Sequence, residues 1–142
     1  MPRADSPKYN YAAKTGTADT LSAASVVGGN AIDPGRCEKG SLSALVEVLA
    51  DTNTFTWTAQ WQVSSDNSTW VNVVAPNNAA NVTLATGTAG TDTKVTRAIV
   101  APQEVWGWAF ARLALITGGT TGAAIDTYSI GYCYRDLGAG SF

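Results

Sequence analysis

Side chains that commonly carry catalysis are scarce in this chain, and their spacing matches no familiar catalytic arrangement. The 142 residues include no histidine, which excludes Ser-His-Asp hydrolases, Cys-His proteases and zinc sites built on imidazole. Paired carboxylates could hydrolyse glycosides, but the acidic residues fall mostly in turn-like segments, and only Glu47 lies inside a predicted strand. We interpret Glu47 as an outward-facing residue on an edge strand. We expect a protein that is not an enzyme and that needs no cofactor.

The two cysteines, Cys37 and Cys133, form neither a metal-binding motif nor a disulfide framework. Cys133 lies among alternating aromatic residues, which favours a small buried hydrophobic role. We expect both thiols to be reduced, while a bridge between them in an oxidising setting stays open. The pair Asp66-x-Ser68 resembles a fragment of a calcium loop, but the full spacing is missing, so we interpret it as turn capping.

The composition narrows the class of protein further. Hydrophobic residues make up 45% of the chain, which argues against disorder, while charged residues make up only 14% and the formal net charge is −2. We expect no nucleic-acid partner, because a basic cluster is missing, and no membrane span, because no apolar run is long enough. The first residues contain no apolar stretch typical of a secretory signal. A surface rich in Thr, Ser, Asn, Gly and Ala fits either burial in an assembly or an ordinary Thr-rich β-domain.

The clearest structural pattern is a strict alternation of apolar and polar residues from Thr54 to Ser64. Its apolar members are Phe55, Trp57, Ala59, Trp61 and Val63. This period of two predicts a long half-buried strand with a Thr/Gln face on the other side. A turn at 65–68 and a returning strand at 70–74 complete a predicted β-hairpin over 54–74.

Further strands are predicted on either side of this hairpin. They cover residues 21–27, 42–50, 94–100, 106–117 and 128–135. The segment 42–50 also fits a helical stripe, but its short length among strands favours a strand. Residues 76–92 are predicted to be a loop with at most one short strand near Val82 and Leu84.

This pattern predicts an all-β fold, an antiparallel two-sheet sandwich with jelly-roll topology. Residues 1–20 contain prolines and no periodicity, and we expect them to form an extended N-terminal arm. Residues 21–142 are expected to form a single β-sandwich domain that ends in a glycine-rich tail.

The aromatic residues suggest where partners bind. Trp57 and Trp61 alternate in register with other apolar residues, so we expect them in the core. Trp106 and Trp108 flank Gly107 on one face at the start of a predicted strand, which favours partner contact. The candidate partner-contact residues are Tyr9, Tyr11, Lys14, Trp106, Trp108 and Phe142. A row of exposed tryptophans would instead be typical of a module that stacks sugars, for example a carbohydrate-binding or adhesin module of a phage tail or fibre.

Three segments resemble those of small tailed-phage virion proteins. They are the hairpin WTAQWQVSSDNSTWVNV at 57–73, the run FARLALITGG at 110–119, and the stretch from Thr20 through Ala31 to Gly35. Over most of residues 20–135 the chain is similar to capsid cement (decoration) proteins of jelly-roll type, such as those of Bordetella-type podophages.

The resemblance implies a structural role without catalytic residues. Such proteins bind the outside of an expanded capsid and clamp neighbouring major capsid proteins against the pressure of packaged DNA. The implied partners are the major capsid protein and a second copy of the chain, with a homodimer favoured over a trimer. The implied location is the capsid exterior of a virion assembled in the host cytoplasm. Tyr9 and Tyr11 would anchor the arm on the shell or on a sister subunit.

Overall fold

The computed structural model describes residues 14–18, 26–50, 55–73, 81–87, 93–119 and 125–137. These residues form nine strands and two short 3-10 helices. In chain order they are β1 (Lys14–Ala18), β2 (Val26–Gly28), η1 (Pro34–Arg36), β3 (Ser43–Ala50), β4 (Phe55–Ser64), β5 (Val71–Asn72), β6 (Asn81–Gly87), β7 (Thr93–Val100), η2 (Gln103–Val105), β8 (Phe110–Gly119) and β9 (Ile125–Cys133).

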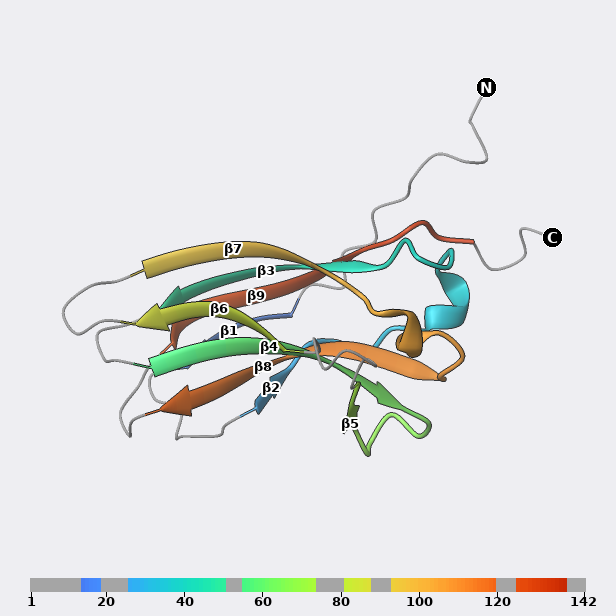
Figure 1. Ribbon diagram of the computed structural model, residues 1–142, viewed down its shortest axis with the longest axis horizontal. Helices are drawn as coiled ribbons and strands as arrows, with labels where there is room; N and C mark the ends of the chain where they lie inside the picture. The colour runs from blue at the N-terminus through green and yellow to red at the C-terminus, as the bar shows by residue number, and fades with distance from the viewer. Residues whose placement is uncertain are drawn as a thin grey trace, which may run out of the picture.

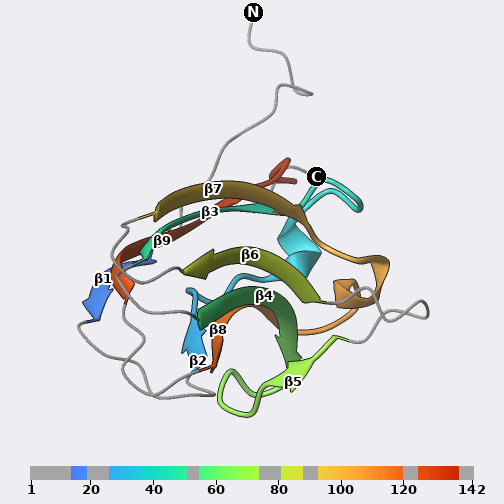
Figure 2. The same ribbon diagram turned by 60° about the vertical axis from the view of Figure 1, so that its left-hand side comes forward.

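The strands form two antiparallel sheets with jelly-roll topology. The first sheet has the order β1-β9-β3-β7, and the second has the order β2-β8-β4-β5, with β6 also paired to β4. Strands of the first half pair with their counterparts in the second half: β1 with β9, β2 with β8, β3 with β7 and β4 with β6. This nested pattern is one long hairpin rolled up on itself, and the sheets stack as two layers (Figures 1 and 2). The predicted antiparallel two-sheet jelly roll is confirmed.

The core lies between the two sheets and is filled by alternate residues of the long strands. Trp57 and Trp61 on β4 are 0% and 2% exposed, as their alternation predicts. The other buried residues include Ala44, Val46, Val48, Leu113, Leu115, Ile130 and Tyr132. On β3, Val46 is 1% exposed and its neighbour Leu45 is 39% exposed, so residues 43–50 follow the strand period rather than the helical one.

One hydrogen bond joins the two sheets through the middle of this core. The Tyr132 hydroxyl on β9 accepts a bond from the backbone N–H of Leu113 on β8, with 3.0 Å between nitrogen and oxygen. That N–H has no partner in the neighbouring strand. The segment that follows β2 bonds to β8 at Gly29, whose N–H donates to the Leu113 carbonyl, and then separates from β8 until Ile32, which bonds to Ala111. The Tyr132 ring also packs against Trp61, with 6.0 Å between ring centroids. A side chain of the first sheet thus supplies the hydrogen-bond acceptor that a backbone N–H of the second sheet lacks.

Strand β1 corrects the predicted extent of the N-terminal arm. Lys14 pairs with Ile130, Thr15 with Ser129 and Gly16 with Tyr128, so residues 14–18 belong to the sandwich. Their sequence, KTGTA, has no apolar period because an edge strand can be held by backbone bonds alone. Residues 1–13 and 19–20 lie outside the described residues.

The predicted hairpin is present, but its returning strand is shorter than expected. Among the described residues, Val71 and Asn72 pair with β4 opposite Val63 and Gln62, and the Val73 N–H donates to the Trp61 carbonyl. Residues 55–60 of β4 pair with β6, the short strand that was expected near Val82. The Thr/Gln face of β4 is also less exposed than expected, because Gln60 is 2% and Gln62 is 7% exposed.

The remaining strands differ from the predictions mainly at their ends. The predicted strand 21–27 overlaps β2 at residues 26–27, and residues 21–25 lie outside the described part of the chain. The strand predicted to begin at 106 begins at Phe110. The last strand, predicted over 128–135, is β9 and spans Ile125–Cys133.

The edge strand β7 carries its own protection against pairing with other chains. It is the last strand in the order of its sheet and pairs with β3 without a register shift. Arg97 lies on this exposed strand, and its Nη1 donates to the neighbouring Thr96 carbonyl at 3.1 Å. A long regular edge is a template for strand addition, and a charged side chain on it opposes that addition.

Replacing Tyr132 with Phe is expected to lower the free energy of unfolding by about 1–3 kcal/mol, since the Leu113 N–H would remain buried without an acceptor. Urea unfolding measures the loss. Tyr128→Phe is the control, because Tyr128 is half-buried and packs at the margin of the core. A Tyr132→Phe protein as stable as the control would contradict the role of the bond.

Gly29→Ala probes the same contact from the other side. An added Cβ would lie 2.5 Å from the Tyr132 hydroxyl and 3.0 Å from the Leu113 carbonyl oxygen, so we expect clear destabilisation. In the Tyr132→Phe background the substitution should cost less, because the shortest of the close contacts, that with the hydroxyl, is gone. Strictly additive effects in the double-mutant cycle would contradict this arrangement.

Arg97→Val is expected to increase concentration-dependent association, because it replaces the edge charge with a β-branched apolar side chain. Sedimentation velocity over a range of concentrations measures it. Ala98→Val is the matched control, since it adds a valine to the same strand and keeps Arg97. Equal association of the two variants would show that the charge does not protect the edge.

Candidate functional site

One end of the sandwich gathers η1, η2 and the residues that follow β9 (Figure 1). We call this the capped end and define it as residues 32–42, 100–108 and 134–137. The sequence Asp33-Pro34-Gly35 starts η1, with the Asp33 carboxylate accepting from the Gly35 N–H at 2.8 Å. Proline at the first helical position supplies a suitable φ, so a local turn signal produces this part of the cap.

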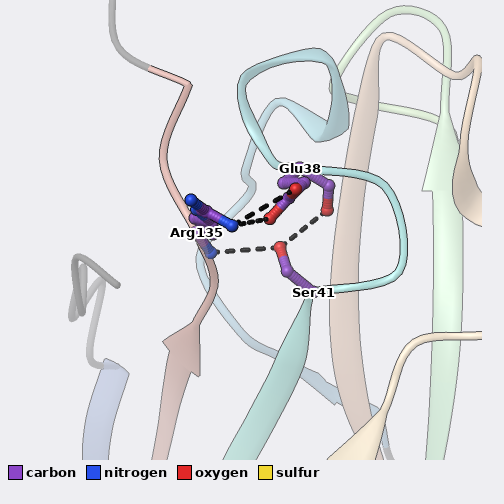
Figure 3. A network of polar contacts seen from close by, with 3 residues as sticks. All are labelled: Glu38, Ser41 and Arg135. Atoms are coloured by element: carbon purple, nitrogen blue, oxygen red, sulfur yellow. Dashed lines mark hydrogen bonds and ion pairs between the residues drawn. The ribbon is translucent and has the colours of Figure 1, made fainter. Parts of the chain in front are cut away.

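A network of polar contacts fastens the segment after β9 to the η1–β3 connection (Figure 3). Arg135 Nη1 lies 3.1 Å and 3.4 Å from the two carboxylate oxygens of Glu38, and its backbone N–H donates to Ser41 Oγ at 3.0 Å. Ser41 Oγ in turn donates to the Glu38 carbonyl at 2.6 Å. The Glu38 N–H donates to the Arg135 carbonyl at 2.7 Å. These bonds tie together residues that are far apart in the chain.

A second pair of contacts extends this fastening. The Leu137 N–H donates to the Arg36 carbonyl at 2.8 Å, and the Arg36 guanidinium lies 3.5 Å from the Asp136 carboxylate. Exposed ion pairs contribute little stability by themselves, so the backbone bonds carry most of the connection. The capped end is therefore a rigid frame rather than a set of independent loops.

An apolar depression lies on this frame. Its volume is about 330 Å³, and it is lined by Lys39, Gly40, Val100, Ala101, Gln103 and Trp106. Val100 is 69% exposed, although it is the last residue of β7. Trp106 packs partly against the core, and the fully buried Val105 anchors η2 beside it. The depression combines a fixed floor with apolar side chains that face solvent, which suits protein contact.

The two tryptophans predicted to bind a partner are both at this end, but they do not share one face of a strand. Gly107 between them has φ of +96°, a conformation that breaks the strand period. As a result Trp106 lines the depression, while Trp108 lies in the connection to β8 and is 46% exposed. The strand period assumed for these residues was wrong because it continued through this glycine.

The other predicted contact residues are not brought to the capped end by the described structure. Lys14 belongs to β1, in the first sheet. Tyr9, Tyr11 and Phe142 lie outside the described residues. Conversely, Val100 was not among the predicted contact residues. The sequence did contain a signal for it, because strand alternation places this apolar residue on the same face of β7 as the polar residues Lys94 and Thr96.

The residues considered for chemistry have structural surroundings. Glu47 lies on β3, which pairs with both β7 and β9, so the predicted edge position is wrong. Its carboxylate is 3.5 Å from Lys94 Nζ and accepts from the Thr96 hydroxyl. The Asp66 carboxylate caps its turn by accepting from the backbone N–H groups of Ser68 and Thr69, which lowers its pKa far below the ordinary range. In the described part of the chain, no group of three potential metal ligands occurs. Nor does that part contain a helix with the length and hydrophobicity needed to cross a membrane.

Both cysteines are free thiols. Cys37 is 4% exposed, and its Sγ donates to the Asp33 carbonyl at 3.6 Å. Burial raises the pKa of the Cys37 thiol to about 12, and the neighbouring carboxylates of Asp136 and Asp33 add to the rise. Cys133 is half-buried, and burial raises its pKa as well.

Comparisons with known proteins assign no family. No protein-family model matches the chain, and no curated protein sequence matches it. Among solved structures it is similar to a chain of infectious bursal disease virus, Gx strain, with TM-score 0.47 and 16% identity over 87% of this chain and 32% of that chain. The chain thus spans about a third of that viral chain's length.

Two further structures resemble it at lower scores. One is a Bacillus endospore appendage from a family of disulfide-linked pili, with TM-score 0.42 and 15% identity over 91% of this chain and 88% of that chain. The other is the CBM22-1–GH10 part of Clostridium thermocellum xylanase 10B in complex with xylohexaose, with TM-score 0.40 and 14% identity over 78% of this chain and 20% of that chain. At these scores the similarities do not assign a function.

The Cys37 thiol predicts how stability depends on alkaline pH. An unfolded thiol ionises near pH 9, whereas folded Cys37 keeps its proton until about pH 12, so its stabilisation is complete below pH 9 and is lost as the pH rises between these values. One such group gives a slope of at most about 1.4 kcal/mol per pH unit. Urea unfolding at several pH values should show a shallower fall for Cys37→Ala than for wild type. Identical slopes would contradict the burial of this thiol.

Proposed function

We propose that this protein is a structural virion protein that binds the outer surface of a tailed-phage capsid and cements neighbouring major capsid proteins. The observation that carries the proposal is the rigid capped end with its exposed apolar side chains. Val100, which lines the depression together with Trp106, is 69% exposed. Trp108, two positions after Trp106 in the chain, is 46% exposed. Such exposed apolar groups on a fixed frame favour a permanent protein contact.

Two features of the whole chain support the same role. The sequence segments at 57–73 and 110–119, which resemble virion proteins, form the hairpin and the central strand of the second sheet. With 14% charged residues, the protein also offers a surface that is easily desolvated against another protein.

Cementing in this proposal needs no catalysis. The sandwich acts as a stiff body, and each copy contributes a modest contact that is repeated over a closed shell. The partners are the major capsid protein and a second copy of this chain as a symmetric dimer, on the exterior of the virion. Residues 14–18 belong to the sheet, so they are not part of an arm that extends this contact.

A second candidate function is sugar binding, as in a carbohydrate-binding or adhesin module of a tail or fibre. The observation that favours it is the exposed indole of Trp108 close in the chain to Trp106. Against it, Trp57 and Trp61 are buried, so the described residues present no long row of exposed tryptophans.

The test is binding to expanded, DNA-free capsids of the phage that encodes the protein, followed by light scattering on a sizing column. The wild type is expected to elute with the shell at a ratio near one copy per capsid protein. The double variant Val100→Ser/Trp108→Ser should lose about tenfold or more in affinity, since exposed aromatic anchors dominate protein interfaces.

Leu49→Ser is the matched control, because Leu49 is a partly exposed apolar residue of β3 that pairs with Lys94, at the other end of that strand from the pair of Ser43 and Val100. It should bind like the wild type. A wild-type protein that stays in the free fraction, and whose tryptophan fluorescence is protected from a quencher by a sugar, would instead support the carbohydrate-binding module.

A further inference from the structure

A second cluster of side chains lies outside the capped end, on the outer face of the second sheet. It centres on Arg112 of β8, which is paired in register with Gln62 of β4. Trp70 and Asn72, from the short returning arm of the hairpin, complete the cluster. The depression and the polar network of the capped end use none of these side chains.

The guanidinium of Arg112 is held in place by several neighbours. Its Nε donates to Gln62 Oε1 at 2.8 Å, and Gln62 Nε2 donates to Asn72 Oδ1 at 2.9 Å. Its Cζ lies 4.2 Å from the centroid of the Trp70 ring, which is a stacking distance for a cation on an indole. A Cβ on Gly28 would collide with the Arg112 guanidinium, so the glycine on β2 leaves the space that the guanidinium occupies. The position of this charge is therefore fixed before any ligand arrives.

The charge is fixed but not neutralised. Among the described residues no carboxylate forms an ion pair with Arg112, and its two terminal nitrogens have no acceptor there. Arg36 and Arg135, in contrast, each pair with a carboxylate. Partial burial lowers the pKa of Arg112, and the nearby Tyr132 opposes this shift. Unused donors on a preorganised guanidinium fit a planar oxyanion, which accepts two parallel bonds.

We propose that Arg112, stacked on Trp70 and oriented by Gln62, binds a carboxylate presented by a side chain of the protein partner. The choice of a protein carboxylate rests on the proposed function, in which the partner is a capsid protein. The oxyanion site itself rests only on the geometry of the cluster. A phosphate would use the same donors, so the two anions are separated by experiment.

The first experiment titrates isotope-labelled wild-type protein with sodium acetate, and separately with sodium phosphate, at constant ionic strength. The expected result is a saturable shift of the Arg112 Nε–H and Trp70 indole N–H NMR signals with acetate. Arg97, whose guanidinium contacts only its neighbour's carbonyl, is the internal control and should not show saturation. No saturation at Arg112 would overturn the site, and saturation with phosphate alone would overturn the carboxylate.

The second experiment measures the affinity of variants for the same DNA-free capsids. Arg112→Lys keeps the charge but loses the planar fork and the stacking, and Arg112→Gln loses both charge and geometry. Both are expected to bind about tenfold or more weakly, as when one member of a charge-assisted pair is removed. Lys94→Gln removes one positive charge from the other sheet, where Lys94 is exposed, and should bind within about twofold of wild type.

The outcomes separate this proposal from the proposed function. Arg112 variants that bind capsids like wild type would overturn the partner carboxylate. A wild-type protein that binds no capsid would overturn the proposed function and the capsid carboxylate together, while acetate saturation would still support the oxyanion site. The acetate titration uses wild-type protein, so it remains decisive even if an Arg112 variant folds poorly.

Discussion

The hydrogen bond between the Leu113 N–H and the Tyr132 hydroxyl is the contact on which the capped end of this sandwich depends. It supplies the acceptor that β8 loses when the chain leaves it between Gly29 and Ile32. A buried donor without a partner would cost about 1–3 kcal/mol, enough to disfavour that departure. Because the chain departs there, it can build η1 and the connection that meets Arg135, and the apolar depression forms beside that connection. A bond inside the core therefore shapes the outer end.

The rolled hairpin explains why the capped end exists only in the folded protein. Its three segments, residues 32–42, 100–108 and 134–137, are far apart in the chain, and they meet because β3 pairs with both β7 and β9. The backbone bonds from Glu38 to Arg135 and from Leu137 to Arg36 then fix their relative position. A surface that is ordered in advance loses little conformational entropy when it docks. The topology thus produces the rigidity, which in the proposed function lowers the entropic cost of docking.

Sequence patterns predicted the parts of this fold that depend on alternation, and they failed where backbone geometry or distant contacts decide. The period of two placed Trp57 and Trp61 in the core and identified the long strands. It missed β1, because KTGTA has no apolar period, and it misplaced Trp108, because Gly107 takes a positive φ. The candidate site was foreseen only through its tryptophans. The exposure of Val100, the burial of Gln60 and the stacking of Arg112 on Trp70 all depend on strands that meet only in the folded protein.

The apolar depression and the Arg112 cluster have complementary physical properties. Apolar contact provides affinity but is not directional. A fixed guanidinium stabilises a complex in the one orientation that places a carboxylate against it, and other orientations lack this contact. Arg112 follows Trp108 closely in the chain, near the start of β8, so in the proposed function one short segment supplies both kinds of contact. The guarded edge of β7 restricts the alternative of open-ended strand addition between copies. A protein built in this way favours defined contacts of limited number, which is what a clamp on a closed shell requires.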